Sequence, residues 1–335
     1  MDSRFPRLLG DFGGTHARLA WQSDAQAAPS RVATLRCDAF DSLHRAISAY
    51  LAEQGGEPPV AAALGIANPI SGDRVQMTNH HWSFSISELQ QSLGLQRLLV
   101  LNDFTALAMS LPALSAADLR PVGGGQAVPG AAVAVLGPGT GLGVSGLIGQ
   151  RPITGEGGHV SLAAADETET RLLAWLLQRF GHASAERALS GPGLVNLYQA
   201  VCALGGQPAE ALTPPELIAR ALAGQDVACV KALEHFCNLL GGVAGNLALT
   251  LGARGGVYIG GGIVPRVLPV LQASAFRERF EAKGRFRDYL AAIPIWVIDR
   301  AVSPALLGAG RALDLGLDLD QGSSFSATSM RDTML

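Results

Sequence analysis

The chain has 335 residues, of which 48% are hydrophobic and 16% charged, and its formal net charge is −3 at pH 7. This length exceeds one ordinary compact domain and predicts two domains or lobes. The basic residues are scattered, so neither nucleic acid nor an anionic membrane surface is expected as a partner.

The N-terminus and the cysteines carry no sign of export. Met1–Phe5 lacks a basic segment followed by an apolar one, and no uninterrupted apolar run reaches the roughly eighteen residues of a membrane span. The four cysteines (Cys37, Cys202, Cys229, Cys237) are widely spaced without a C-x-x-C pair, which predicts reduced core thiols and no zinc site. We therefore expect a cytoplasmic protein.

Up to about residue 111 the sequence predicts one α/β lobe with the order β-β-β-α-β-α-β-α. Strands are expected over Leu8–Gly10, Leu19–Trp21, Arg31–Arg36, Val60–Ile66 and Leu98–Leu101. Helices are expected over Ser42–Glu53, with Asp41 as its cap, and over Ile86–Leu93 and Phe104–Leu111. A glycine-rich turn at 11–15 joins the first two strands.

From residue 131 the chain uses a strand, a glycine turn and a strand again, and then becomes mostly helical. The expected strands are Ala131–Leu136, Val144–Ile148, Gly256–Ile259 and Ile295–Ile298. The expected helices are Glu169–Phe180, Pro192–Leu204, Pro214–Ala223, Val227–Leu251 and a last one starting at Ser303-Pro304. The second unit of strand, glycine turn and strand is a weak internal repeat of the first. It predicts two similarly built lobes.

Asn102 and Asp103 follow a buried strand and precede a helix. Two polar residues at the carboxyl end of a strand lie where α/β proteins usually bind ligands. Asp103 is equally placed to cap the following helix. On this stretch alone, the cap is the simpler interpretation.

The two glycine turns, Gly10–Thr15 and Gly137–Gly143, are each either a tight hairpin turn or a phosphate-binding loop. Glycine is required where the backbone must approach phosphate oxygens closely. The pair, each with a threonine, favours phosphate. A Walker A loop is excluded because neither lysine, Lys231 or Lys283, lies in a Gly-Lys-Ser/Thr sequence. A dinucleotide fold fits poorly because a strand follows the second turn.

Other polar and glycine positions are also ambiguous. Asp11 suits Mg²⁺ held through water, or is a turn aspartate. Gly260–Gly262 either admits a flat base or simply ends a buried strand. Glu156, His159 and Glu186 are acceptors suited to vicinal sugar hydroxyls, although each alone has an ordinary structural interpretation.

Five motifs in this order resemble the bacterial glucokinase family: Gly10-Asp11-Phe12-Gly13-Gly14-Thr15, Leu101-Asn102-Asp103-Phe104, Gly139-Thr140-Gly141-Leu142-Gly143, Gly155-Glu156-Gly157-Gly158-His159 and Gly260-Gly261-Gly262-Ile263. Further matches are Met77-Thr78-Asn79-His80, Ser184-Ala185-Glu186-Arg187 and Leu189-Ser190-Gly191-Pro192-Gly193. The resemblance covers about Leu9 to Leu317. The ordered set is far more specific than any single motif.

The resemblance implies an α/β fold of two ribonuclease-H-like lobes around a central cleft, as in actin-like ATPases. It implies a small lobe of residues 1–113 with 303–318, a large lobe of 114–302 and a homodimer, while the polar residues 319–335 suggest a flexible tail. It also implies transfer of the ATP γ-phosphoryl group to the 6-hydroxyl of glucose, with Asp103 as general base. The implied sugar ligands are Asn102, Asp103, Glu156, His159 and Glu186. The implied ATP and Mg²⁺ contacts are Gly10, Asp11, Phe12, Gly13, Gly14, Thr15, Gly139, Thr140, Gly141, Gly143, Gly261 and Gly262, with Asp11 holding Mg²⁺ through water.

Three residues depart from the family pattern: His16 replaces the usual Asn, Asn68 a usual small residue, and Pro138 stiffens the second turn. Two alternative functions stay open, a kinase for another hexose and a sugar-binding regulator that has lost catalysis. The regulator is disfavoured because the first strand begins within about ten residues, without a preceding DNA-binding module.

Overall fold

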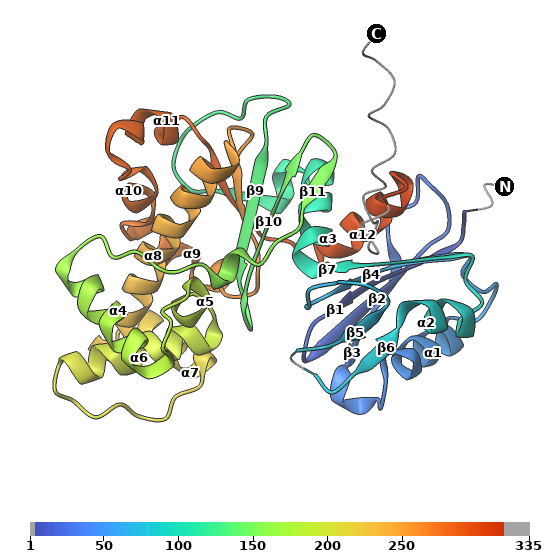
Figure 1. The fold of residues 1–335 in the computed structure, drawn as a ribbon, viewed down its shortest axis with the longest axis horizontal. Helices are drawn as coiled ribbons and strands as arrows, with labels where there is room; N and C mark the ends of the chain where they lie inside the picture. The colour runs from blue at the N-terminus through green and yellow to red at the C-terminus, as the bar shows by residue number, and fades with distance from the viewer. Residues whose placement is uncertain (1–3, 79, 318–335) are drawn as a thin grey trace, which may run out of the picture. The chain divides into compact units, whose positions relative to one another are not determined.

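The structure, a computed structural model, describes residues 4–78 and 80–317 (Figure 1). Its contacts divide the chain into two compact units, residues 1–106 with 305–335 (unit 1) and residues 107–304 (unit 2). The sequence placed the lobes at 1–113 with 303–318 and at 114–302. The predicted flexible tail, 319–335, lies outside the described residues.

Unit 1 contains a five-stranded sheet in the order β3-β2-β1-β4-β7. β1 is antiparallel to β2 and parallel to β4, which is parallel to β7. The register pairs Phe12 with Ile66 and Ile66 with Asn102, so the carboxyl ends of three parallel strands share one edge. The expected strands are confirmed as β1 (Arg7–Phe12), β2 (His16–Gln22), β3 (Ser30–Arg36), β4 (Ala61–Ile66) and β7 (Arg97–Asn102).

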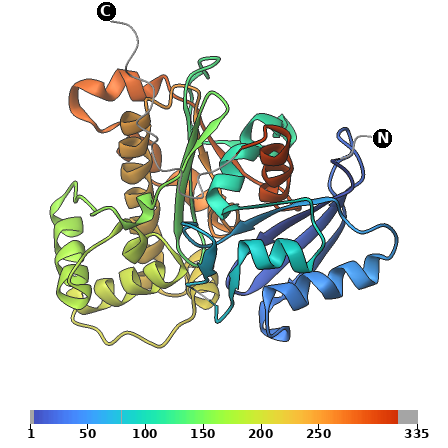
Figure 2. The same ribbon diagram turned by 45° about the vertical axis from the view of Figure 1, so that its right-hand side comes forward.

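Helices cover both faces of this sheet (Figure 2). α1 (Leu43–Gln54) and α2 (Ile86–Ser92) bury their apolar sides against one face. On the other face, α12 (Pro304–Asp314) places Gly310 against the Leu9 side chain. The expected cap of α1 was wrong: Ser42 lies one residue nearer the helix, and its hydroxyl accepts a bond of 3.2 Å from the N–H of Arg45.

Unit 2 repeats the strand order of unit 1. Its sheet runs β11-β10-β9-β12-β13-β8, and the first five strands have the same directions as β3-β2-β1-β4-β7. The predicted internal repeat is therefore confirmed. The strands are β8 (Leu119–Pro121), β9 (Val133–Pro138), β10 (Leu142–Ile148), β11 (Arg151–Ile153), β12 (Val257–Ile259) and β13 (Ile295–Ile298).

The helices of unit 2 gather around α8 (Val227–Leu251), which contacts α6 (Gly191–Leu204), α7 (Pro214–Leu222) and α10 (Phe276–Glu281) (Figure 1). Gly241 and Gly245 let α10 approach, since a Cβ there would lie 2.1 Å and 2.4 Å from its carbonyl oxygens. Among the described residues α8 alone is long and apolar enough to span a membrane, but half of that window is buried in the unit. It is the central core helix.

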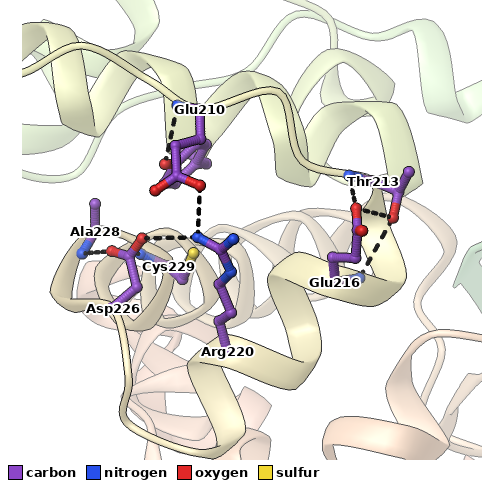
Figure 3. A network of polar contacts seen from close by, with 8 residues as sticks. Glu210, Thr213, Glu216, Arg220, Asp226, Ala228 and Cys229 are labelled. Atoms are coloured by element: carbon purple, nitrogen blue, oxygen red, sulfur yellow. Dashed lines mark hydrogen bonds and ion pairs between the residues drawn. The ribbon is translucent and has the colours of Figure 1, made fainter.

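The other α-helices that lie wholly in unit 2 are α4 (Glu167–Phe180), α5 (Ala185–Ala188), α9 (Leu268–Ala273) and α11 (Arg287–Ala291). The connections between α6, α7 and α8 are held by capping side chains (Figure 3). The Asp226 carboxylate accepts bonds of 2.7 and 3.1 Å from the N–H groups of Ala228 and Cys229. Burial acts to raise the pKa of Asp226, but these bonds outweigh it and hold the pKa below its usual 3.8.

Candidate functional site

The first glycine turn, 13–15, lies at the carboxyl edge of the unit 1 sheet. The N–H of Gly13 donates to the carbonyl of His16 at 3.0 Å, and the N–H of Cys37 donates to the carbonyl of Thr15 at 2.9 Å. Just before this turn, the carboxylate of Asp11 lies 3.3 Å from the Arg18 guanidinium. The turn is therefore held by backbone bonds, with one carboxylate beside it.

Two residues assigned to nucleotide binding are packed into the core. The Phe12 side chain is fully buried, and a Cβ at Gly10 would lie 2.5 Å from its ring and 2.8 Å from Leu64. The Phe12 ring is therefore a core group, and only the backbone of these two residues is left to face a ligand. The alternation of side chains along a strand explains this, because Gly10 and Phe12 point to the same face.

Asn102 and Asp103 lie where β7 passes directly into α3 (Asp103–Ser110). The Asn102 Oδ1 atom accepts bonds of 2.9 and 3.1 Å from the N–H groups of Phe104 and Thr105. This is the bonding pattern of an N-cap, so Asn102, and not Asp103, caps the helix. Asp103 Oδ1 also accepts from the N–H of Phe104 at 2.9 Å, which orients its side chain.

The second glycine turn, 139–141, joins β9 and β10 in unit 2. The N–H of Gly139 donates to the carbonyl of Gly141, and the Gly139 carbonyl accepts from Gly191 at the start of α6, both at 2.8 Å. The Gly260–Gly262 segment lies against this turn, since a Cβ at Gly261 would approach the Pro138 carbonyl to 2.3 Å. The exposed Thr140 lies in the turn, and Gly143 pairs with Gly137 across the two strands.

Six of the eight predicted ligand glycines separate into two groups. The protein's own packing accounts for three of them: Gly10 faces Phe12, Gly141 faces Glu186 and Gly261 faces Pro138. A Cβ at Gly139 or Gly262 would meet nothing within 4 Å, and one at Gly13 would meet only a carbonyl at 3.5 Å. None of these last three has a left-handed φ. Neither packing nor backbone conformation demands glycine at positions 13, 139 and 262, which favours close approach of a ligand there.

The loop carrying Glu156 and His159 lies against β10. A Cβ at Gly158 would lie 2.1 Å from the Leu142 carbonyl, and one at Gly157 would lie 2.8 Å from Val144. Glycines therefore bring this loop onto the strand. The two polar side chains are about half-exposed, with His159 Nε2 4.0 Å from a Glu156 carboxylate oxygen.

Glu186 lies on α5, which contacts the Glu156–His159 loop, and its side chain bonds beside the second glycine turn. The N–H of Ala185 donates to the carbonyl of Val160 at 2.8 Å, which places α5 beside the Glu156–His159 loop. The Glu186 Oε2 atom accepts a bond of 2.9 Å from the N–H of Leu142, next to the glycine turn. The sequence assigned Glu186 to the sugar alone and missed this bond to the turn, because residue spacing does not indicate it.

The sequence assigned no role to Asn68 and Thr78, which lie near Asn102. Asn68 Oδ1 accepts bonds from the hydroxyl and the N–H of Thr78, at 2.6 and 2.9 Å. The Asn102 amide in turn donates to the Asn68 carbonyl at 3.4 Å. The Met77–His80 motif was the available signal, although Asn79 within it lies outside the described residues.

Comparison with known proteins decides among the kinase and regulator alternatives. A model of the glucokinase family matches residues 8–315. A curated glucokinase of Aromatoleum aromaticum is 56% identical over 95% of this chain and 98% of its own. The chain belongs to the glucokinase family.

Solved glucokinases share its fold. The glucokinase of an Antarctic psychrotroph is 37% identical, covers 92% of this chain and 99% of its own, and superimposes with a TM-score of 0.84. A ROK family glucokinase from Streptomyces griseus, solved in complex with glucose and AMPPNP, has a TM-score of 0.64 at 20% identity over 93% and 99% of the two chains. The fold is that of the actin-like ATPases, as expected. As a glucokinase family member, the chain is an ATP-dependent glucose kinase.

Proposed function

We propose that Asp103 is the general base that accepts the proton of the glucose 6-hydroxyl as that oxygen attacks the γ-phosphorus of ATP. The observation that carries this assignment is its place at the first turn of α3, directly after the parallel strand β7. The bond from the N–H of Phe104 fixes its rotamer. A positioned base of this kind typically contributes about 10²–10⁴ in rate.

The other sugar contacts come from four polar groups, those of Asn102, Glu156, His159 and Glu186. Asn102 Oδ1 is occupied by the helix N–H groups, so its amide hydrogens are what it offers to a hydroxyl. Glu156 and Glu186 accept from sugar hydroxyls, and His159 accepts or donates according to its tautomer. The proximity of the Glu156 loop to α5 supports this grouping.

The two glycine turns bind the phosphates through backbone N–H groups. Gly13 and Gly139 support this role, because neither packing nor φ demands glycine there. Gly14, Thr15 and Thr140 complete the two turns, Gly143 lies just after the second turn in β10, and Gly262 lies open for the adenosine. His16, beside the first turn, replaces the Asn that is usual in the family.

A single carboxylate suits Mg²⁺, which takes few carboxylates alongside phosphate oxygens and water. Across residues 4–78 and 80–317, no three His, Cys, Asp or Glu side chains gather as a metal cluster. Asp11 is therefore the residue that would hold Mg²⁺, through water, beside the first turn. The bound ion would neutralise charge on the transferred phosphoryl group.

We further propose that the enzyme works in the cytoplasm as a homodimer, in keeping with the family resemblance. The catalytic assignment is tested with Asp103→Asn. Isothermal titration should show glucose binding within about threefold of wild type, while kcat falls by about 10²–10⁴. A variant that binds glucose and keeps near-normal kcat would overturn the assignment.

A further inference from the structure

Asn68 lies in the loop after β4, at the same sheet edge as Asn102. Its Oδ1 atom accepts from both the N–H and the hydroxyl of Thr78, and its Nδ2 donates to the Pro69 carbonyl at 2.9 Å. The half-buried Asn68 side chain thus makes three bonds in a largely exposed loop. Such a side chain fixes the loop backbone, including the Asn68 carbonyl.

Thr78, the partner of Asn68, lies in the connection between two short paired strands. β5 (Arg74–Gln76) and β6 (Ser83–Ser85) pair antiparallel, and the N–H of Met77 donates to the carbonyl of Trp82 at 3.0 Å. Trp82 is 2% exposed, and its indole N–H donates to the Phe40 carbonyl at 3.0 Å. Thr78, one residue beyond Met77, therefore extends from a well-anchored element.

The Asn68 carbonyl accepts a long bond, 3.4 Å, from the Asn102 amide nitrogen. The other end of the same amide caps α3 through the N–H groups of Phe104 and Thr105. An amide nitrogen carries two hydrogens in one plane. When one of them is bonded to the Asn68 carbonyl, the direction of the other is fixed as well. The hairpin, Asn68 and Asn102 thus form one hydrogen-bonded chain that ends at α3.

We propose that Asn68 is a positioning residue for glucose: anchored by Thr78, it holds the Asn102 amide in the orientation that donates to a sugar hydroxyl. This inference rests on the proposed assignment of Asn102 to the sugar site. Asn68 acts on glucose affinity and not on the base, because the cap bonds of Asn102 to α3 do not pass through it. This proposal gives a function to Asn68, which stands where the family usually has a small residue.

The test compares Asn68→Ala and Thr78→Val with two matched controls, Thr78→Ser and Ser71→Ala. Thr78→Ser keeps the hydroxyl that donates to Asn68, and Ser71 is an exposed residue of the same loop. We expect Asn68→Ala to raise the KM for glucose by about three- to tenfold, the effect of one oriented hydrogen bond. Thr78→Val should cause a smaller rise, and both controls none. The KM for ATP and kcat should stay within error of wild type in every variant. The Tm of Asn68→Ala should fall by about 2–4 °C, because its three loop bonds are lost, and the Tm of both controls should not change.

The inference fails if Asn68→Ala leaves the KM for glucose unchanged. It also fails if the KM for ATP rises equally, since that marks general loosening of unit 1. The double variant Asn68→Ala/Asn102→Ala should have the KM of Asn102→Ala alone, and an additive rise would mean that Asn68 does not act through Asn102. Failure of the underlying assignment of Asn102 to the sugar site is read separately, from an unchanged KM for glucose in the single variant Asn102→Ala.

Discussion

Gly139 tests whether the second glycine turn binds phosphate. A Cβ at this position meets nothing within 4 Å, and the two backbone bonds of Gly139 survive replacement by alanine. Its φ lies outside the left-handed region, so alanine adopts it without strain. Gly139→Ala should therefore stabilise the unliganded protein by about 0.4–1 kcal/mol through the unfolded chain, a Tm increase of roughly 1–4 °C.

The same methyl group should weaken nucleotide binding, because it occupies the space above the turn. Loss of one charge-assisted bond from backbone to phosphate is worth about 1.5–3 kcal/mol, which is roughly a 10- to 150-fold rise in the KM for ATP. The assay pairs thermal denaturation without ligand with steady-state kinetics against ATP and glucose. The KM for glucose should barely move.

Gly141→Ala, two residues along the same turn, is the matched control. Its Cβ would lie 2.4 Å from a Glu186 carboxylate oxygen, the mobile end of a side chain, and would displace Glu186 from the N–H of Leu142. This variant should raise the KM for glucose, whereas Gly139→Ala raises that for ATP. A stabilised Gly139→Ala protein with an unchanged KM for ATP would refute the phosphate role of the turn.

Two further predictions concern unit 2 away from the site. Asp226→Ala removes the cap of α8 (Figure 3), so Tm should fall by roughly 2–4 °C for a loss of about 1 kcal/mol, with kcat and both KM values unchanged. An unchanged Tm would show that the cap is dispensable. Burial holds the pKa of His235 below its usual 6.5, outweighing the opposing effect of Glu169, so the unfolded chain takes up the proton first. The contribution of His235 to stability should be complete above pH 6.5 and should be lost as the pH falls below it. Tm should therefore decline more steeply with falling pH in wild type than in His235→Gln. Parallel Tm–pH curves for the two proteins would contradict this.

Long elements with strong periodicity were predictable from sequence. The apolar runs of β4 and β7 and the four long helices of unit 2 each satisfy one pattern over many residues, and all were confirmed. The short strands β5, β6, β8 and β11 span three residues each, too few to show alternation. The short helices α9, α10 and α11 were missed for the same reason, since each spans only five or six residues.

The candidate site was predictable as motifs but not as contacts. Glycine density located both turns, yet it could not separate Gly139, which faces open space, from Gly141, which faces Glu186. Likewise, adjacent Asn102 and Asp103 are both suitable caps, and only the hydrogen bonds distinguish them. The pairing of Asn68 with Thr78 depends on the β5–β6 hairpin, which no local sequence pattern predicted.

The most direct test of the account is the rate of the chemical step itself. In a rapid-quench single turnover, enzyme saturated with glucose is mixed with limiting MgATP, and glucose 6-phosphate is followed for wild type and Asp103→Asn. A base at Asp103 predicts a phosphoryl-transfer rate lower by about 10²–10⁴ in the variant, with glucose still bound. An equal single-turnover rate in the two proteins would contradict the assignment of Asp103 as general base.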